Sequence, residues 1–324
     1  MEQSEGQEQA VTQPGDAGEV RDAPAIQPSA DNETVTTLPA QAGPGTCATC
    51  GSPLESNPEG GEMATYSYVY ALGRVEVRFP SLALEKEFVQ ATGRAETTGL
   101  TDRQAVNAIL SGRQNRYLAR QLCYVLTIEG LETYILQPRD PADFDLLVEA
   151  IRPAPRPTDV DAVIGIRGPI APPQMCNGLM VPVVGFDQIY SFDIDSLIAG
   201  IPQPEGIATE QFQPAAEELL MRIMQLADNA GATDEHRALN YLVMRYPAIY
   251  HQTTELFGRN FSLTSVEVRA SRLSGVRNIV DVIFSYTNRQ TNVTEKYFVR
   301  VDVTEEFPFL VTRISPYYVY DQYP

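Results

Sequence analysis

The first 62 residues contain no aromatic side chain, and this absence limits what they can fold into. They hold seven Pro, eight Gly and only six residues of the Val, Ile and Leu set. Such a segment buries too little apolar surface to offset the entropy that a chain loses on folding. It also carries eleven Asp or Glu against one basic residue, Arg21. We therefore predict that residues 1–62 are a disordered acidic tail or linker.

Folded structure is predicted to begin near residue 63, where large residues start to alternate with small ones. Tyr66, Tyr68, Tyr70 and Leu72 have the period of two that is typical of a strand, and the pattern continues to Phe79. Further strands are expected at 122–128, 133–136, 160–167 and 179–190, and helices at 81–92, 101–110, 113–120 and 141–151. This order predicts a mixed α/β part over residues 63–205.

A proline cluster at 201–204 marks a predicted boundary near residue 205. Apolar stripes at helical spacing predict helices over 214–228 and from Thr233 to Tyr246, where Pro247 breaks or kinks the chain. Period-two segments at 263–272, 276–286, 296–303 and 309–315 predict an antiparallel β-meander with one solvated face. The predicted fold class is α+β: a mixed α/β part, then a helical pair and a meander over 206–324.

Charge and hydropathy limit the partners and the compartment. The formal net charge is -18, and the chain offers no Lys/Arg-rich stripe of the kind that binds phosphates, so nucleic acid is not an expected partner. No segment approaches the roughly 20 apolar residues that span a bilayer, and the N-terminus lacks the pattern of a secretory signal. We expect a cytoplasmic protein without a membrane partner. Four cysteines in such a chain indicate reduced thiols or a metal rather than disulfides.

The most specific local motif is Cys47-Ala-Thr-Cys50, whose spacing lets two thiolates bind one metal ion. Cys123 and Cys176 are the other cysteines, so a structural four-cysteine zinc site is a hypothesis, and it would tie the end of the tail to the body. For Cys123, a small buried residue on an apolar strand is the stronger explanation. A redox motif is disfavoured, because redox C-x-x-C pairs begin a helix within a βαβ unit.

Motifs for catalysis or for binding nucleotides are absent from the sequence, so we assign no catalytic residue and expect no nucleotide or redox cofactor. The cluster from Asp234 to Arg237 resembles a site, but Thr233 as N-cap and acids near the helix dipole explain it. If the protein is an enzyme, Glu129, His236 and the arginine-rich helix around Arg116 are the weak candidates for a polar site.

Four long segments resemble one known family. They are 70–81, 126–138, 299–312 and Asp228-Asn-Ala-Gly-Ala-Thr-Asp-Glu-His-Arg-Ala-Leu-Asn-Tyr-Leu242. They resemble the C-terminal domain of unknown function of the cyanobactin maturation proteases, the patellamide-type PatG and PatA proteins. The resemblance runs from about residue 66 to about residue 320. The protease part of those proteins, with its Asp, His and Ser triad, resembles no segment of this chain.

The resemblance implies an accessory, non-catalytic interaction module in the biosynthesis of ribosomally synthesised, post-translationally modified peptides. Its partners would be a precursor or processed peptide and the maturation enzymes. A chain that starts at Met1 with this tail would be a free-standing version of the module. Two alternatives are an uncharacterised enzyme that acts on the modified peptide and a dimerisation scaffold, a homodimer whose interface would use Tyr317, Tyr318 and Tyr320. A pocket that joins Glu129, His236 and Arg116 would favour the enzyme.

Overall fold

The computed structural model describes residues 67–94, 99–203, 209–225 and 229–318. These residues belong to one compact unit that spans Glu62–Pro324. The predictions for residues 1–62, including Cys47 and Cys50, lie outside the described residues. No helix within the described ranges is long and apolar enough to cross a membrane.

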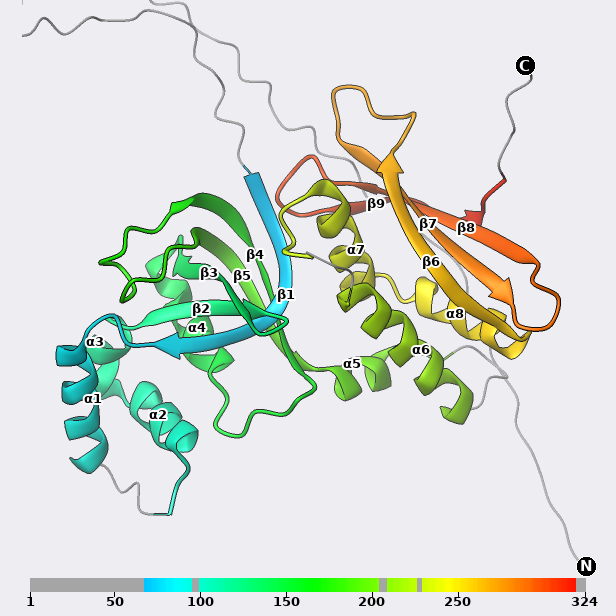
Figure 1. The fold of residues 1–324 in the computed structure, drawn as a ribbon. Coiled ribbons are helices and arrows are strands. Elements are labelled where there is room, and N and C mark those ends of the chain that lie inside the picture. Colours follow the sequence, from blue (N-terminus) through cyan, green and yellow to red (C-terminus); the bar gives the residue numbers. More distant parts are fainter. Residues whose placement is uncertain (1–66, 95–98, 204–208, 226–228, 319–324) are drawn as a thin grey trace, which may run out of the picture. The chain divides into compact units, whose positions relative to one another are not determined.

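Five strands close into a barrel in the order β1-β2-β3-β5-β4 (Figure 1). Their bounds are β1 Ser67–Arg78, β2 Cys123–Ile128, β3 Leu131–Pro138, β4 Asp159–Ile170 and β5 Pro182–Asp193. β3 and β5 are parallel, and the other neighbours are antiparallel. This topology, with a helix between β3 and β4, is that of the OB fold, a five-stranded Greek-key barrel.

Strand β1 is buried on both faces because it belongs to two cores. Val69 and Ala71 point into the barrel core, whereas Tyr70 and Leu72 join the core that the C-terminal helices form. At Gly73 the strand leaves β4 and begins to pair with β2. A Cβ atom at Gly73 would lie 2.6 Å from the backbone oxygen of Thr127, so only glycine fits this bend.

The predicted helices around the barrel are present. Their bounds are α1 Leu82–Arg94, α2 Asp102–Ser111, α3 Arg116–Ala119 and α4 Phe144–Ala150. Thr101 and Gln104 form the predicted capping box at the start of α2. The hydroxyl of Ser81 accepts a hydrogen bond from the Leu84 N–H at 3.3 Å, as expected for an N-cap. The apolar sides of these helices share one core with the barrel interior.

After the barrel, the described residues form four helices, α5 before residue 205 and three beyond it, and a four-stranded antiparallel sheet in the order β6-β7-β8-β9. The bounds are α5 Ile194–Gly200, α6 Thr209–Met224, α7 Asp234–Arg245, α8 Ala248–Gly258, β6 Phe261–Ala270, β7 Ile279–Asn288, β8 Thr294–Asp302 and β9 Phe309–Pro316. The predicted meander and the α+β class are confirmed. The prediction that a helix begins at Pro214 is wrong. Pro214 lies inside α6, because the preceding turn buries Phe212 completely.

Helix α8 was not predicted as a separate element, and its sequence explains why. Thr253 and Thr254 interrupt the apolar pattern, yet both are buried. Their hydroxyls donate to the backbone oxygens of Ile249 and Tyr250 at 2.7 and 2.8 Å, so the polar groups are satisfied inside the helix. The predicted helical pair therefore continues into a third helix after Pro247.

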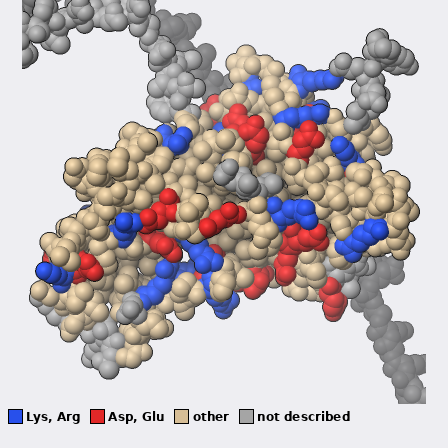
Figure 2. Space-filling model, in the orientation of Figure 1, with Lys and Arg blue, Asp and Glu red and all other residues tan. Residues whose placement is uncertain are grey.

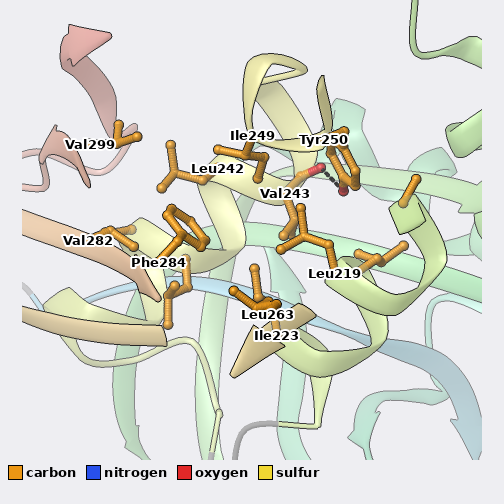
Figure 3. Close-up of a cluster of buried hydrophobic side chains, with 14 of the residues drawn as sticks. Leu219, Ile223, Leu242, Val243, Ile249, Tyr250, Leu263, Val282, Phe284 and Val299 are labelled. Atoms are coloured by element: carbon orange, nitrogen blue, oxygen red, sulfur yellow. Dashed lines mark hydrogen bonds between the residues drawn. The ribbon is translucent and has the colours of Figure 1, made fainter. Parts of the chain in front are cut away.

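Helices α6, α7 and α8 pack on the inner face of the meander (Figure 3). The Tyr250 hydroxyl donates to the backbone oxygen of Val243 at 2.8 Å, drawn as a dashed line in Figure 3. The same core includes Tyr70 and Ile164 from the barrel. Residues 63–205 and 206–324 thus share a core, and their independence as two domains stays a prediction.

Candidate functional site

A pocket of about 520 Å³ lies where the barrel meets helix α6. Its volume is in the range of pockets that bury a small ligand or a few residues of a chain. Six segments supply its walls: β1, the β2–β3 turn, the start of β4, α5, the end of α6 and Asn229 before α7. The apolar lining residues are Leu72, Ile128, Pro157, Val160, Ile194, Met221 and Met224, and the charged ones are Arg74, Glu76, Glu129 and Asp159. We call this the α6 pocket.

Glu129 occupies an unusual backbone position at the edge of the α6 pocket. It has φ +50° and is followed by Gly130 at φ +82°, so the two residues form the predicted tight hairpin turn. Asn or Gly is the usual first residue of such a turn, and another side chain there costs about 1 kcal/mol or more. Glu129 makes no hydrogen bond or ion pair within the part of the chain that the structure describes. Its exposed carboxylate is therefore available to a ligand.

Two other charges of the α6 pocket are already engaged. The Arg74 guanidinium donates from Nε to the backbone oxygen of Asp159 at 3.1 Å and also to the backbone oxygen of Pro157. The Asp159 carboxylate accepts from Arg152 Nη1 at 2.6 Å and from the Arg156 backbone N–H at 2.7 Å. These groups hold the wall of the pocket and are not free for a ligand.

Glu76 is the second carboxylate without a charged partner among the described residues. Within the described residues, the Glu76 carboxylate accepts one hydrogen bond, and it is a long one. The Thr127 hydroxyl donates to Glu76 Oε2 over 3.5 Å. Figure 2 shows that acidic and basic side chains are interspersed over one face of the molecule. The local charge of a pocket therefore depends on which carboxylates are paired. In the α6 pocket, Glu76 and Glu129 leave it negative.

Asp161 lies behind the pocket and has a structural role. It accepts from the Val75 backbone N–H at 2.7 Å and from the Ser191 hydroxyl at 2.6 Å. Burial raises the pKa of this carboxyl, and the two hydrogen bonds act in the opposite direction. Asp161 thus replaces a missing strand partner for β1 just after the bend at Gly73.

The structure separates the three residues of the weak polar site. Glu129 lines the α6 pocket, but His236 and Arg116 line no pocket found in the described ranges. His236 lies in the first turn of α7, where its backbone N–H donates to the hydroxyl of Thr233 at 3.2 Å. Arg116 forms an ion pair with Asp145, whose Oδ2 lies 2.7 Å from Nη2. Sequence analysis missed Glu76 and Arg74, because they are ordinary outward positions of a strand.

The cluster around Arg237 is structural, as the capping argument predicted. Thr233 is the N-cap of α7, and Arg237 is almost completely buried. Its guanidinium donates to the backbone oxygens of Val303 at 2.7 Å and of Glu305, so it fixes the β8–β9 turn. These hydrogen bonds give the charged cluster from Asp234 to Arg237 a structural role, so no catalytic or binding role is needed to explain it.

Cys123 and Cys176 form a disulfide, with their Cα atoms 5.8 Å apart. The expectation of reduced thiols is therefore wrong for this pair, because the β4–β5 loop places the two residues within bonding distance. No group of three or more His, Cys, Asp or Glu that could hold a metal occurs among the described residues. The four-cysteine zinc site stays a prediction, and it requires this disulfide to be reduced.

The β4–β5 loop covers the outer face of β2 and β3. Met175, Leu179 and Val181 of the loop pack in one cluster with Val125 and Ile135 of the strands. In other OB folds this face binds oligonucleotides or oligosaccharides. A second hollow of about 450 Å³ remains at its edge, lined by Arg120, Tyr124, Phe144 and Met175 among others. The α6 pocket is the larger of the two and carries the unpaired charges.

Comparison with known proteins supports the expected resemblance. Residues 207–317 match the family described as PatG C-terminal. A solved structure described as PatG Domain of Unknown Function has a TM-score of 0.63 and 20% sequence identity, over 78% of this chain and 98% of that chain. At this identity the likeness shows a shared fold. No curated protein matches the sequence. Residues 207–317 are therefore similar to the PatG C-terminal family, and most of the described chain shares the fold of that solved structure.

Proposed function

We propose that this protein is an accessory, non-catalytic module that binds a peptide in a cyanobactin-type biosynthetic pathway, and that the peptide docks in the α6 pocket. The observation that carries the proposal is the pocket itself, about 520 Å³ in volume with an apolar lining and two unpaired carboxylates. The match of residues 207–317 to the PatG C-terminal family supports the pathway.

A peptide suits this pocket better than a nucleic acid does. The formal net charge of the chain is -18, and phosphates would be repelled by Glu76 and Glu129. The OB face that could receive an oligonucleotide is covered by the β4–β5 loop. A precursor or processed peptide offers apolar side chains for Leu72, Val160 and the methionines.

We also propose that Cys47 and Cys50 hold a structural zinc ion with Cys123 and Cys176 when all four thiols are reduced. The C-x-x-C spacing supports the first pair of ligands. The proximity of Cys123 to Cys176 supports the second, since two sulfurs that can bond to each other can also bind one ion.

The test of peptide binding uses the methionines as reporters. Met221 and Met224 line the α6 pocket and Met175 lines the second hollow, so methyl signals of the full chain report where a ligand binds. Titration with the precursor peptide of a cyanobactin-type pathway should shift the signals of Met221 and Met224. Met221→Trp should block the pocket and abolish the shift of Met224.

The matched control is Met180→Trp. Met180 is 59% exposed and lines neither pocket, so this variant should bind the peptide as the unmodified chain does. Loss of binding in both variants, or a shift confined to Met175, would contradict the α6 pocket as the docking site.

A further inference from the structure

We infer that the α6 pocket binds the positively charged amino end of a peptide whose first side chain is apolar. The inference rests on the proposed function and names the chemical group that the pocket selects. It follows from the positions of Glu76 and Glu129 beside the apolar wall. It also follows from the other two charged residues, Arg74 and Asp159, because both already have hydrogen-bond partners.

The two unpaired carboxylates come from neighbouring elements of the barrel. Glu76 follows the bend in β1 at Gly73, and Glu129 is in the turn between β2 and β3. β1 and β2 are paired from Arg74 to Arg78, with Glu76 opposite Val125, and both Glu76 and Glu129 line the pocket. A hollow with low-dielectric walls concentrates their field and attracts a cation.

One basic side chain of the pocket, Arg74, offsets part of this negative charge but forms no ion pair with either carboxylate among the described residues. Arg74 is the basic residue among those that line it, and its guanidinium is held by the backbone oxygens of Asp159 and Pro157. Asp159 is compensated by Arg152 from outside the pocket. An anionic ligand would therefore meet two unpaired carboxylates, whereas an ammonium group would give them the partner that they lack.

The rest of the lining requires an apolar group close to the charge. Leu72, Ile128 and Val160 come from three strands or their ends, and Met221 and Met224 face them from α6. Methionine side chains adapt to ligands of different shape, so the pocket can accept several apolar residues. An ammonium group next to a variable apolar side chain describes the first residue of a peptide.

The experiment compares three peptides that differ in whether they carry a positive charge and in which group carries it. The probes are Leu-Ala-Ala amide with a free amino end, the same peptide acetylated at that end, and acetyl-Lys-Ala-Ala amide. Each is titrated into the full chain at low salt while the methyl signals of Met221 and Met224 are followed. The free-amine peptide should bind about tenfold more tightly than the acetylated one, as the loss of one charge-assisted hydrogen bond predicts.

Variants then assign the preference to the two carboxylates. In the double variant Glu76→Gln, Glu129→Gln, the free-amine and acetylated peptides should bind equally. The control is Glu149→Gln, which removes one exposed carboxylate of α4 that lines neither pocket, and it should keep the preference. Equal melting temperatures of the variants would show that folding is unaffected.

Each other outcome has a distinct meaning. Equal binding of the first two peptides to the unmodified chain would overturn the inference and leave the proposed docking site intact. Binding of the lysine peptide as tight as that of the free-amine peptide would overturn the assignment to an amino end. No shift of Met221 and Met224 with any peptide, the precursor included, would overturn the inference and the proposed function together.

Discussion

The side-chain amide of Asn240 in α7 donates a hydrogen bond to the backbone oxygen of Tyr70 in β1, with 2.7 Å between the two atoms. The Tyr70 N–H donates to the backbone oxygen of Gly231 at 2.9 Å. Up to Gly73, β1 pairs only with β4, so the second edge of the strand needs such partners. The α6–α7 segment therefore provides the missing partners of β1 and completes the barrel. This gives a structural role to Asn240, which the sequence alone placed only in a segment that resembles a family.

Replacing Asn240 with Leu should lower the free energy of unfolding by about 2 kcal/mol, the cost of leaving a buried polar group without a partner. Asn240 is fully buried, and its amide also bonds to Asn229, so the variant would leave two groups unsatisfied. Urea denaturation measures the change. Gln290→Ala, at an exposed amide, is the control and should unfold at the same urea concentration as the unmodified chain.

Gly231→Ala should destabilise the protein more than a typical surface substitution. Gly231 has φ +69°, and an added Cβ would lie 2.3 Å from the backbone oxygen of Tyr70. The strained backbone alone costs on the order of 1 kcal/mol, and separating the loop from β1 adds to it. The control is Gly200→Ala in α5, where an added Cβ meets nothing within 4 Å. That variant should be as stable as the unmodified chain or slightly more so. An unchanged melting temperature for Gly231→Ala would contradict the tight contact with β1.

These two contacts show what the sequence can and cannot predict. The capping box at Thr101 and the turn at Glu129 were predicted, because each depends on residues close together in the chain. Asn240 and Tyr70 are 170 positions apart, and no local pattern pairs them. The parallel pair β3·β5 that closes the barrel is equally non-local. The α6 pocket was unpredictable for the same reason, since six separate segments form it and Glu129 was the one site candidate among its lining residues.

The stability of the protein should depend on pH through Glu306. Burial, together with the hydrogen bond to the neighbouring Asp187, raises the pKa of Glu306 to about 7 against the opposing effect of Arg139. Burial also acts to raise the pKa of Asp187, but hydrogen bonds from Glu306 and Arg139 outweigh it and lower the value. The two carboxyls thus share a proton between the β8–β9 turn and the barrel.

The direction of each pKa shift determines whether the stability of the protein rises or falls with pH. The raised pKa of Glu306 gives stability that is complete below its unfolded value of 4.5 and is lost as the pH rises through about 7. The lowered pKa of Asp187 gives stability that is present above 3.8 and is lost in stronger acid. We expect the free energy of unfolding to fall by roughly 1 kcal/mol from pH 6 to pH 8.5, after allowance for partial solvent exposure. Urea denaturation at both pH values measures this, and Glu306→Gln should remove most of the decline. An identical decline in Glu306→Gln would assign it to other groups.

The cysteines should bind zinc only when they are reduced. Chain purified in the presence of a reductant should contain about one zinc ion per molecule, since four thiolates match the usual structural site. Oxidised chain should lack the metal, because Cys123 and Cys176 are then bonded to each other. Elemental analysis of the two preparations, with thiol titration after denaturation, measures both states.

Two paired variants separate this zinc site from a disulfide that merely holds the β4–β5 loop. Cys47→Ser with Cys50→Ser should remove the zinc from reduced protein and leave the Cys123–Cys176 disulfide of oxidised protein intact. Cys123→Ser with Cys176→Ser should remove both, and should loosen the loop that covers β2 and β3, since Met175 and Leu179 lose their covalent tie. Reduced, folded protein without zinc would refute the metal site. In that case the buried pair acts only as a covalent link between the loop and the start of β2, the one role that the positions of Cys123 and Cys176 require.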